Sequence, residues 1–251
     1  MGQVPLPETS LPLAPDRPVD PAPGTDLPAA VLWDMDGTLV DTEPAWMAAE
    51  ASLVEEFGGV WTHEDALQMI GMPLLPAAAI LQAHGVDLPV DVIGERLVAS
   101  VVDAVGRHLA WQPGALELLA ALRDAGVPCA LVTMSYREFA EAVLTQGPPG
   151  TFDVVVTGDE VTHGKPHPEP YLRAAELLGV DVARCVAIED SPPGIASALA
   201  AGARTLGVQH IAPVEAQPGL SRAGTLAGVG LDELRAIVRG DVLDLLEAPA
   251  A

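Results

Sequence analysis

Two aspartates, Asp34 and Asp36, follow directly on an apolar run in the stretch AVLWDMDGTL, residues 30–39. A carboxylate at the end of a buried strand is costly, and a second one nearby repels the first. Two carboxylates in different surroundings can, however, divide the roles of an ionised nucleophile and a general acid and base. The pair is therefore a candidate for catalysis, although Asp-Gly is also an ordinary turn signal.

Polar side chains also follow three later apolar runs of the chain. Thr133 and Ser135 follow one run, Lys165 comes shortly after the second, and Glu189 and Asp190 end the third. Because ligand sites in open parallel sheets lie outside the carboxyl ends of the strands, we expect these residues to meet the two aspartates. Each residue alone has a structural interpretation, such as a helix cap or a turn, but four strands that end this way favour one shared site.

The residue types at this edge suit a phosphate group and a divalent metal ion. Oxygen ligands from Asp34, Glu189 and Asp190, with the backbone carbonyl of Asp36, are typical of Mg²⁺. Lys165, the only lysine in the chain, adds a second positive charge. Positive charge is needed because an anionic nucleophile and an anionic phosphate repel each other by about 4 kcal/mol per charge pair at about 4 Å and an effective dielectric of about 20. The pattern therefore indicates phosphoryl transfer to a carboxylate.

The segments that must position these residues alternate between strand-like and helix-like patterns. Short apolar runs predict strands, and the stretches between them predict helices that end at glycines such as Gly126, Gly179 and Gly202. This alternation predicts an α/β fold with a Rossmann-like, doubly wound parallel sheet. A last helix is predicted for residues 231–249, with an interruption at Gly240. The predicted strands are residues 29–34, 128–133, 152–158, 184–190 and 203–209.

The spacing of the strands predicts two domains. Far more residues separate the first predicted strand from the second than a crossover needs, and their pattern is helical. This excess predicts an inserted helical cap of residues 45–110 on an α/β core of residues 29–44 and 111–251. Residues 1–28 contain eight prolines and little aliphatic clustering, which predicts a disordered tail.

The composition narrows the class of protein. Twelve basic residues against 35 acidic ones argue against binding to nucleic acid or to an anionic membrane surface. No apolar run is long enough to cross a bilayer, and the N-terminus lacks the pattern of a secretory signal. We therefore expect a cytoplasmic protein, and its oligomeric state stays open. Cys129 and Cys185 lie in strand-like runs and are expected to be small buried thiols.

Four stretches, DMDGTLVDTE, LVTMS, GKPHPEPY and IEDSPPGIASALAAGA, resemble the four motifs of the haloacid dehalogenase superfamily, in its phosphatase and β-phosphoglucomutase-like branch. The resemblance extends from residue 29 to about residue 210. It implies that Asp34 is the nucleophile that forms an aspartyl-phosphate. It also implies that Asp36 first protonates the leaving oxygen and then activates water.

The resemblance implies the other site residues and the domain that closes over them. The helical insertion corresponds to the family's cap, which chooses the substrate and excludes water. The implied cofactor is Mg²⁺, and the implied substrate is a small phosphomonoester of the sugar or polyol class. The predicted substrate-binding residues are Thr133, Met134, Ser135, Lys165 and Arg137, and the predicted metal ligands are Asp34, Asp36, Glu189 and Asp190.

Single positions distinguish among the activities of the superfamily. Dehalogenases usually lack the second aspartate, which is present here as Asp36, and phosphonate hydrolases use a cap lysine, which this cap does not contain. Phosphomutases of the β-phosphoglucomutase type place a histidine near the position of Trp46 and use a cap lysine, and neither is matched. We therefore favour a phosphatase. A mutase and a non-catalytic member that binds phosphate or a partner stay as alternatives.

A few further residues are candidates for contacts with the substrate or a metal. In the cap, Trp46 and Met72 fit either core packing or a face toward the substrate, and Glu43 is a further candidate. Arg96 fits either a second anionic group on the substrate or a solvated helix face, and we favour the latter. His163 and His167 have a spacing that suits zinc, but we favour a role in shaping their loop.

Overall fold

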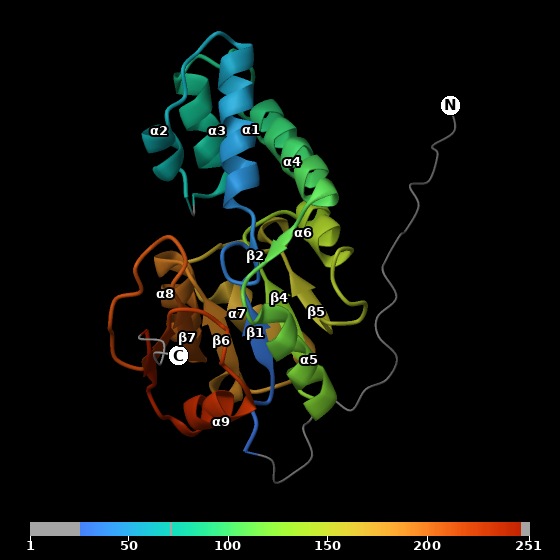
Figure 1. Cartoon of the computed structure of the whole chain (residues 1–251), viewed down its shortest axis with the longest axis vertical. Helices are drawn as coiled ribbons and strands as arrows, with labels where there is room; N and C mark the ends of the chain where they lie inside the picture. Colours follow the sequence, from blue (N-terminus) through green and yellow to red (C-terminus); the bar gives the residue numbers. More distant parts are fainter. Residues whose placement is uncertain (1–25, 71, 247–251) are drawn as a thin grey trace, which may run out of the picture.

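The computed structural model describes residues 26–70 and 72–246. Residues 1–28 were predicted to be a disordered tail, and residues 1–25 of it lie outside the described residues. Within the described residues a seven-stranded sheet forms the core, in the order β5-β4-β1-β6-β7-β8-β9, and every pairing in it is parallel (Figure 1). The strands are β1 (Val31–Trp33), β4 (Cys129–Val132), β5 (Val154–Val156), β6 (Val186–Glu189), β7 (Arg204–Val208), β8 (Leu220–Ala223) and β9 (Asp244–Leu245).

Helices cover both faces of the sheet, which explains why β1 (VLW) and β4 (CALV) are apolar and buried throughout. On β1, Val31 and Trp33 pack into one buried cluster, while Leu32 packs into another on the opposite face. The first cluster contains side chains of α5 (Ala115–Ala125), α6 (Arg137–Leu144) and α9 (Leu231–Arg239), and the second contains side chains of α7 (Glu169–Leu178) and α8 (Pro192–Ala201). This is the predicted doubly wound α/β arrangement. Cys129 and Cys185 are both buried, as expected.

The strand order reverses beside β1. The chain runs from β1 outward through β4 to β5, and then returns to the other side of β1 with β6 and β7. The loops after β1 and β6 therefore leave a crevice between them at the carboxyl edge of the sheet. Both aspartates of the first motif lie in the loop after β1, whereas in the acidic pair of the last motif Glu189 ends β6 and Asp190 begins the loop that follows.

The end of the chain differs from the prediction of one last helix over residues 231–249. Helix α9 ends at Arg239, because Gly240 takes a left-handed conformation with φ of 106° that ends a helix. The chain then continues as the edge strand β9, so the helix predicted beyond Gly240 is wrong for the described residues. Strand β8 was also not expected, since its sequence LSRA carries little apolar signal.

The predicted insertion is a helical cap above the core (Figure 1). Its helices are α1 (Glu43–Glu56), α2 (His63–Leu67), α3 (Leu74–Ala83) and α4 (Val90–Arg107). They lie between β2 (Val40–Asp41) and β3 (Ala110–Trp111), which pair antiparallel and join the cap to the core. The boundaries at residues 45 and 110 stay a prediction. In the described part of the chain, every helix is too short or too polar to cross a membrane.

Candidate active site

The turn after β1 brings the first motif against the last. The backbone N–H of Asp34 donates to the carbonyl of Ile188 on β6, at 3.0 Å. Gly37 has a φ of 87°, and a Cβ atom there would lie only 2.2 Å from Oδ2 of Asp190. Glycine is therefore needed at this position for the turn and for the close approach.

Lys165 lies at the centre of a buried network of polar groups. Its Nζ lies 2.6 Å from Oδ1 of Asp34 and 2.6 Å from Oε1 of Glu189, and it donates to the carbonyl of Val132 at 2.9 Å. The hydroxyl of Tyr171 donates to the same oxygen of Glu189 at 2.7 Å. These three acceptors match the three protons of an ammonium group, so the lysine is held in one position.

The acidic pair after β6 completes a group of three carboxylates. Asp34, Glu189 and Asp190 each bring a carboxylate oxygen within 4.8 Å of the others. The hydroxyl of Ser191 donates to Oε2 of Glu189 at 3.1 Å, and that of Thr38 donates to Oδ1 of Asp190 at 3.2 Å. Both oxygens of Glu189 therefore already have partners within the protein.

Asp36 is surrounded by hydroxyl groups. Thr42 donates to its Oδ1 at 2.6 Å, and Ser135 and Thr133 donate to its Oδ2 at 2.8 Å and 3.3 Å. Its carboxylate is not part of the group of Asp34, Glu189 and Asp190, so only its backbone carbonyl stays a candidate metal ligand. Asp34 and Asp36 thus have the different surroundings that a division of roles requires.

Burial governs the protonation of this site. It raises the pKa of Asp34 to about 7, with the charge of Glu189 adding to the effect and that of Lys165 opposing it. Burial likewise raises the pKa of Asp190 to about 9, helped by the charges of Asp34 and Glu189. For Lys165, burial favours the neutral amine, but the two neighbouring carboxylates outweigh it and raise the pKa.

The site fits a divalent metal ion. Three ionised carboxylates against the one ammonium of Lys165 leave two negative charges, which is the charge that Mg²⁺ would neutralise. The donors are all oxygens, as Mg²⁺ prefers. Burial, and then the charges of the neighbouring carboxylates, raise the pKa values of Asp34 and Asp190, and a bound cation would oppose both effects.

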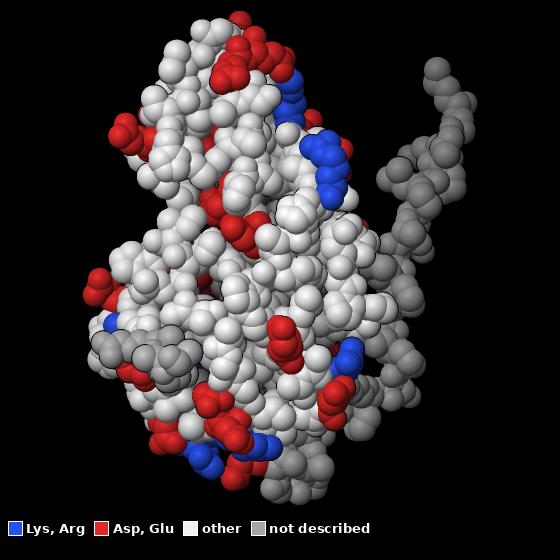
Figure 2. Space-filling view, viewed as in Figure 1, with Lys and Arg blue, Asp and Glu red and all other residues white. Residues whose placement is uncertain are grey.

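A cavity of about 390 Å³ lies above this group, between the core and the cap. Figure 2 shows acidic side chains gathered at the waist between the cap helices and the core. Met134 lines the cavity, and its sulfur accepts a hydrogen bond from the backbone N–H of Lys165 at 3.2 Å. The cap residues named from the sequence, Glu43, Trp46 and Met72, also line it, and so does Glu50.

Two arginines considered from the sequence point elsewhere. The guanidinium of Arg137 donates to Oε2 of Glu160 at 2.6 Å and to the carbonyl of Val155 at 3.0 Å. The guanidinium of Arg96 forms a two-fold pair with Glu56, at 3.0 Å and 2.6 Å. Neither arginine is among the residues that line the cavity. Each guanidinium instead pairs with a carboxylate outside it, Glu160 for Arg137 and Glu56 for Arg96. For Arg96 this agrees with the favoured solvated helix face. The guanidinium of Arg137 lies away from the cavity, and its predicted contact with the substrate stays a prediction.

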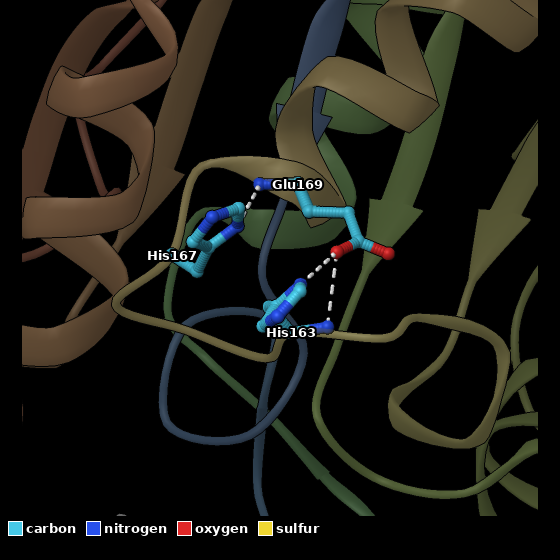
Figure 3. A group of neighbouring side chains, drawn as sticks. All are labelled: His163, His167 and Glu169. Atoms are coloured by element: carbon cyan, nitrogen blue, oxygen red, sulfur yellow. Dashed lines mark hydrogen bonds and ion pairs between the residues drawn. The ribbon is translucent and has the colours of Figure 1, made fainter.

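His163 and His167, on either side of Lys165 in the sequence, form hydrogen bonds with Glu169 within the loop that carries the lysine (Figure 3). The carboxylate of Glu169 accepts from the backbone N–H groups of Thr162 and His163, at 2.7 Å and 2.9 Å, and pairs with Nδ1 of His163 at 2.9 Å. Nδ1 of His167 accepts from the backbone N–H of Glu169 at 3.2 Å. These internal hydrogen bonds agree with the role in loop shape. The two histidines and Glu169 also bring one ligand atom each within 4.8 Å of the others, so the same donors could hold a metal ion.

Several residues that support the site were not singled out from the sequence. Three of them lie within the quoted motifs, namely Tyr171, Thr38 and Ser191. Their position in the sequence near the motif carboxylates could have identified them. Glu50 had no such signal, because only the packing of α1 over the core turns it toward the cavity.

Comparison with known proteins identifies the fold and the family. The family model described as haloacid dehalogenase-like hydrolase matches residues 28–202. The chain is 32% identical over 213 residues to a phosphorylated carbohydrates phosphatase of Thermotoga maritima, a match that covers 84% of this chain and 98% of that protein. It is also 32% identical over 188 residues to a bifunctional riboflavin kinase/FMN phosphatase of Arabidopsis thaliana, covering 74% of this chain and about half (49%) of that protein.

A solved structure shares the arrangement of core and cap. CbbY from Rhodobacter sphaeroides, in complex with phosphate, superposes with a TM-score of 0.75 at 28% identity and covers 82% of this chain and 98% of that one. The family model extends from the strand that precedes Asp34 to the end of α8, and it therefore includes all four motifs. The chain belongs to the haloacid dehalogenase-like hydrolase family.

Proposed function

We propose that the chain is a Mg²⁺-dependent phosphatase that hydrolyses a small phosphomonoester of the sugar or polyol class through an aspartyl-phosphate on Asp34. The observation that carries this proposal is the position of Lys165, which contacts both Asp34 and Glu189 at the base of a cavity that Asp36 also lines. Similarity to phosphatases, one of them acting on phosphorylated carbohydrates, supports the substrate class.

In the first step, a carboxylate oxygen of Asp34 attacks the phosphorus atom, and the bond from phosphorus to the ester oxygen breaks. The carboxyl group of Asp36 gives its proton to the departing alkoxide, which leaves as an alcohol. Lys165, Thr133 and Ser135 line the cavity beside the two aspartates. Their donors contact Asp34, Asp36 and Glu189 in this structure, and a bound phosphoryl group would have to take over some of these hydrogen bonds.

In the second step, the carboxylate of Asp36, now ionised, takes a proton from a water molecule. The water oxygen attacks the phosphorus atom, the bond to Asp34 breaks, and inorganic phosphate leaves. The same residue therefore acts as acid and then as base, and both protonation states are restored at the end of the cycle.

Mg²⁺ would be held by Asp34, Asp190 and the backbone carbonyl of Asp36, and it supplies positive charge against the phosphoryl oxygens. Glu189, the remaining predicted ligand, belongs to the same group of carboxylates. Its two oxygens already contact Lys165, Tyr171 and Ser191, so a direct contact with the metal stays a prediction.

The test is phosphate release from a panel of sugar phosphates, polyol phosphates, FMN and nucleotides, with Mg²⁺ and with EDTA. We expect release that needs Mg²⁺ and is fastest with sugar or polyol phosphates. In parallel, NMR follows β-glucose 1-phosphate. Conversion to glucose 6-phosphate with little free phosphate would contradict the phosphatase and indicate a mutase. Binding without release from every compound would instead favour the non-catalytic alternative.

A further inference from the structure

One face of helix α1 forms the cap side of the cavity. Glu43, Trp46 and Glu50 follow each other at spacings of three and four residues, which places them on the same side of a helix, and all three line the cavity. A helix rises by about 1.5 Å per residue, so the Cα atoms of the two glutamates lie about 10 Å apart along the cap. Glu43 is the first residue of α1, two residues after β2, so it lies at the end of the helix that is nearer to the core.

One carboxylate oxygen of Glu50 is buried and lacks a hydrogen-bond donor within the described part of the chain. The residue is only 5% exposed, and its Oε2 has no hydrogen-bond partner among the described residues. The indole of Trp61 is near enough to favour the ionised form in part, but its N–H also lacks a hydrogen-bond partner. A buried carboxylate with an unmet oxygen costs free energy, which a ligand that donates a hydrogen bond would recover.

The cavity also lacks positive charge on the cap side. Among the described residues that line it, Lys165 is the one lysine or arginine, and its ammonium is already engaged by Asp34 and Glu189. The rest of the cap lining is apolar and includes Met69, Leu74 and Leu97. A second anionic group on a substrate would therefore meet carboxylates and apolar side chains.

We propose that Glu43 and Glu50 bind the uncharged, hydroxyl-bearing end of a polyol or sugar monophosphate, and that they exclude substrates with a second anionic group at that end. The inference rests on the proposed function, because it takes the phosphate group to lie at Asp34. Hydroxyl groups along the substrate would donate to the two carboxylates on the single face of α1, and the apolar residues would contact its carbon chain.

The experiment compares two compounds that differ only at the far carbon. Sorbitol 6-phosphate ends in a hydroxymethyl group, whereas 6-phosphogluconate ends in a carboxylate. Values of kcat/KM for both are measured at pH 8 with Mg²⁺, for the wild type, Glu43→Gln, Glu50→Gln and the control Glu55→Gln. Glu55 lies on the same helix but is exposed and does not line the cavity. Binding of each compound is measured separately, from the shift in the midpoint of thermal unfolding.

We expect the wild type to prefer sorbitol 6-phosphate by about a hundredfold, because like charges would face each other in the alternative. Glu50→Gln should reduce this preference by about tenfold, and Glu55→Gln should leave it unchanged. Equal or faster hydrolysis of 6-phosphogluconate by the wild type would overturn the inference while leaving a phosphatase in place. An unchanged preference in both Glu43→Gln and Glu50→Gln would overturn the assignment to these residues.

Absence of Mg²⁺-dependent phosphate release from both compounds and from p-nitrophenyl phosphate would be a failure of the proposed function instead. The thermal shifts still decide the inference in that case. A larger shift with sorbitol 6-phosphate that Glu50→Gln reduces supports it, and an equal or larger shift with 6-phosphogluconate overturns it.

Discussion

The core side and the cap side of the cavity are built in opposite ways. On the core side, the oxygens of Glu189 and the ammonium of Lys165 find partners within the protein at hydrogen-bonding distance. On the cap side, the lining is apolar apart from Glu43 and Glu50, and one oxygen of Glu50 has no partner among the described residues.

This difference suggests that the core side positions the reacting groups, while the cap side selects the substrate. Groups that must hold one geometry for a reaction are fixed by neighbours in the protein, so that no reorganisation is needed when charge develops. Groups that recognise a substrate must keep hydrogen-bonding capacity for it, as we propose for the oxygen of Glu50 that has no partner among the described residues. Substitutions on the core side should therefore affect the chemistry and the fold strongly, while substitutions on the cap side should affect selectivity.

The largest effect is expected for Asp34→Asn on the core side. Removal of the proposed nucleophile should lower kcat by at least about a thousandfold. The fold should persist, because an amide avoids the cost of burying an ionised carboxylate. Phosphate release and the unfolding midpoint are measured beside Asp87→Asn, an exposed position in the cap. Retained turnover in Asp34→Asn would show that the nucleophile is a different residue.

Lys165→Met should be the most destabilising of these substitutions. The side chain is 5% exposed, and its loss leaves the carboxylates of Asp34 and Glu189 buried without a countercharge, at a cost of about 3–5 kcal/mol in the free energy of unfolding. Arg137→Met is the matched control, because its partner Glu160 is partly exposed and can be solvated, so that about 1 kcal/mol or less is lost. Urea unfolding at pH 7 measures both, and equal losses would contradict the account.

On the cap side, Glu50→Gln should change how stability depends on pH. Burial raises the pKa of Glu50 from 4.5 to about 7, with the charge of Glu43 adding to the effect and Trp61 opposing it. Between these values the folded state holds a proton that the unfolded state releases, so stability falls as pH rises from 4.5 to about 7 and is constant above that. The variant should lack this loss, which is at most about 3 kcal/mol.

Urea unfolding at pH 5, 6, 7 and 8 measures this dependence. Glu55→Gln removes one exposed charge from the same helix and so corrects for the acidic character of the whole chain. If the curves of Glu50→Gln and Glu55→Gln were parallel across this range, Glu50 would not be a buried carboxyl with a raised pKa.

The smallest effect is expected for Tyr171→Phe. Loss of the hydroxyl that donates to Glu189 should cost about 2 kcal/mol in the free energy of unfolding, since the acceptor is a buried charge. Turnover should fall less than in Asp34→Asn, because Lys165 and Ser191 still hold Glu189. A thermal melt and a kcat measurement check both points. An unchanged melting midpoint would show that this hydrogen bond does not support the site.

The polar residues at the carboxyl edge of the sheet could be predicted from the sequence, because each of them lies next to the apolar run that forms its strand. Asp34, Thr133 and Glu189 each lie at or just after the end of an apolar run, and parallel strands bring such ends to one edge. Strand β8 and the edge strand β9 were missed because they are short and carry little apolar pattern.

The partners of long side chains could not be predicted in this way. Arg137 is close to the site in sequence, but its guanidinium reaches Glu160, a choice that depends on the path of a loop. Glu50 lies in the middle of a helix, and its role depends on which face of α1 turns toward the core. Such contacts are set by packing between segments that are distant along the chain.

We propose above that Asp34 carries the phosphoryl group during turnover, and this can be tested directly. Wild type and Asp36→Asn, in which the second step should be slow, are quenched in acid with substrate and Mg²⁺ present and then reduced with borohydride. Peptide mass spectrometry locates the modified residue, with Asp34→Asn as the control. Homoserine is expected at position 34, formed by reduction of an acyl phosphate. Continued phosphate release with an unmodified Asp34, or modification of another carboxylate, would contradict it.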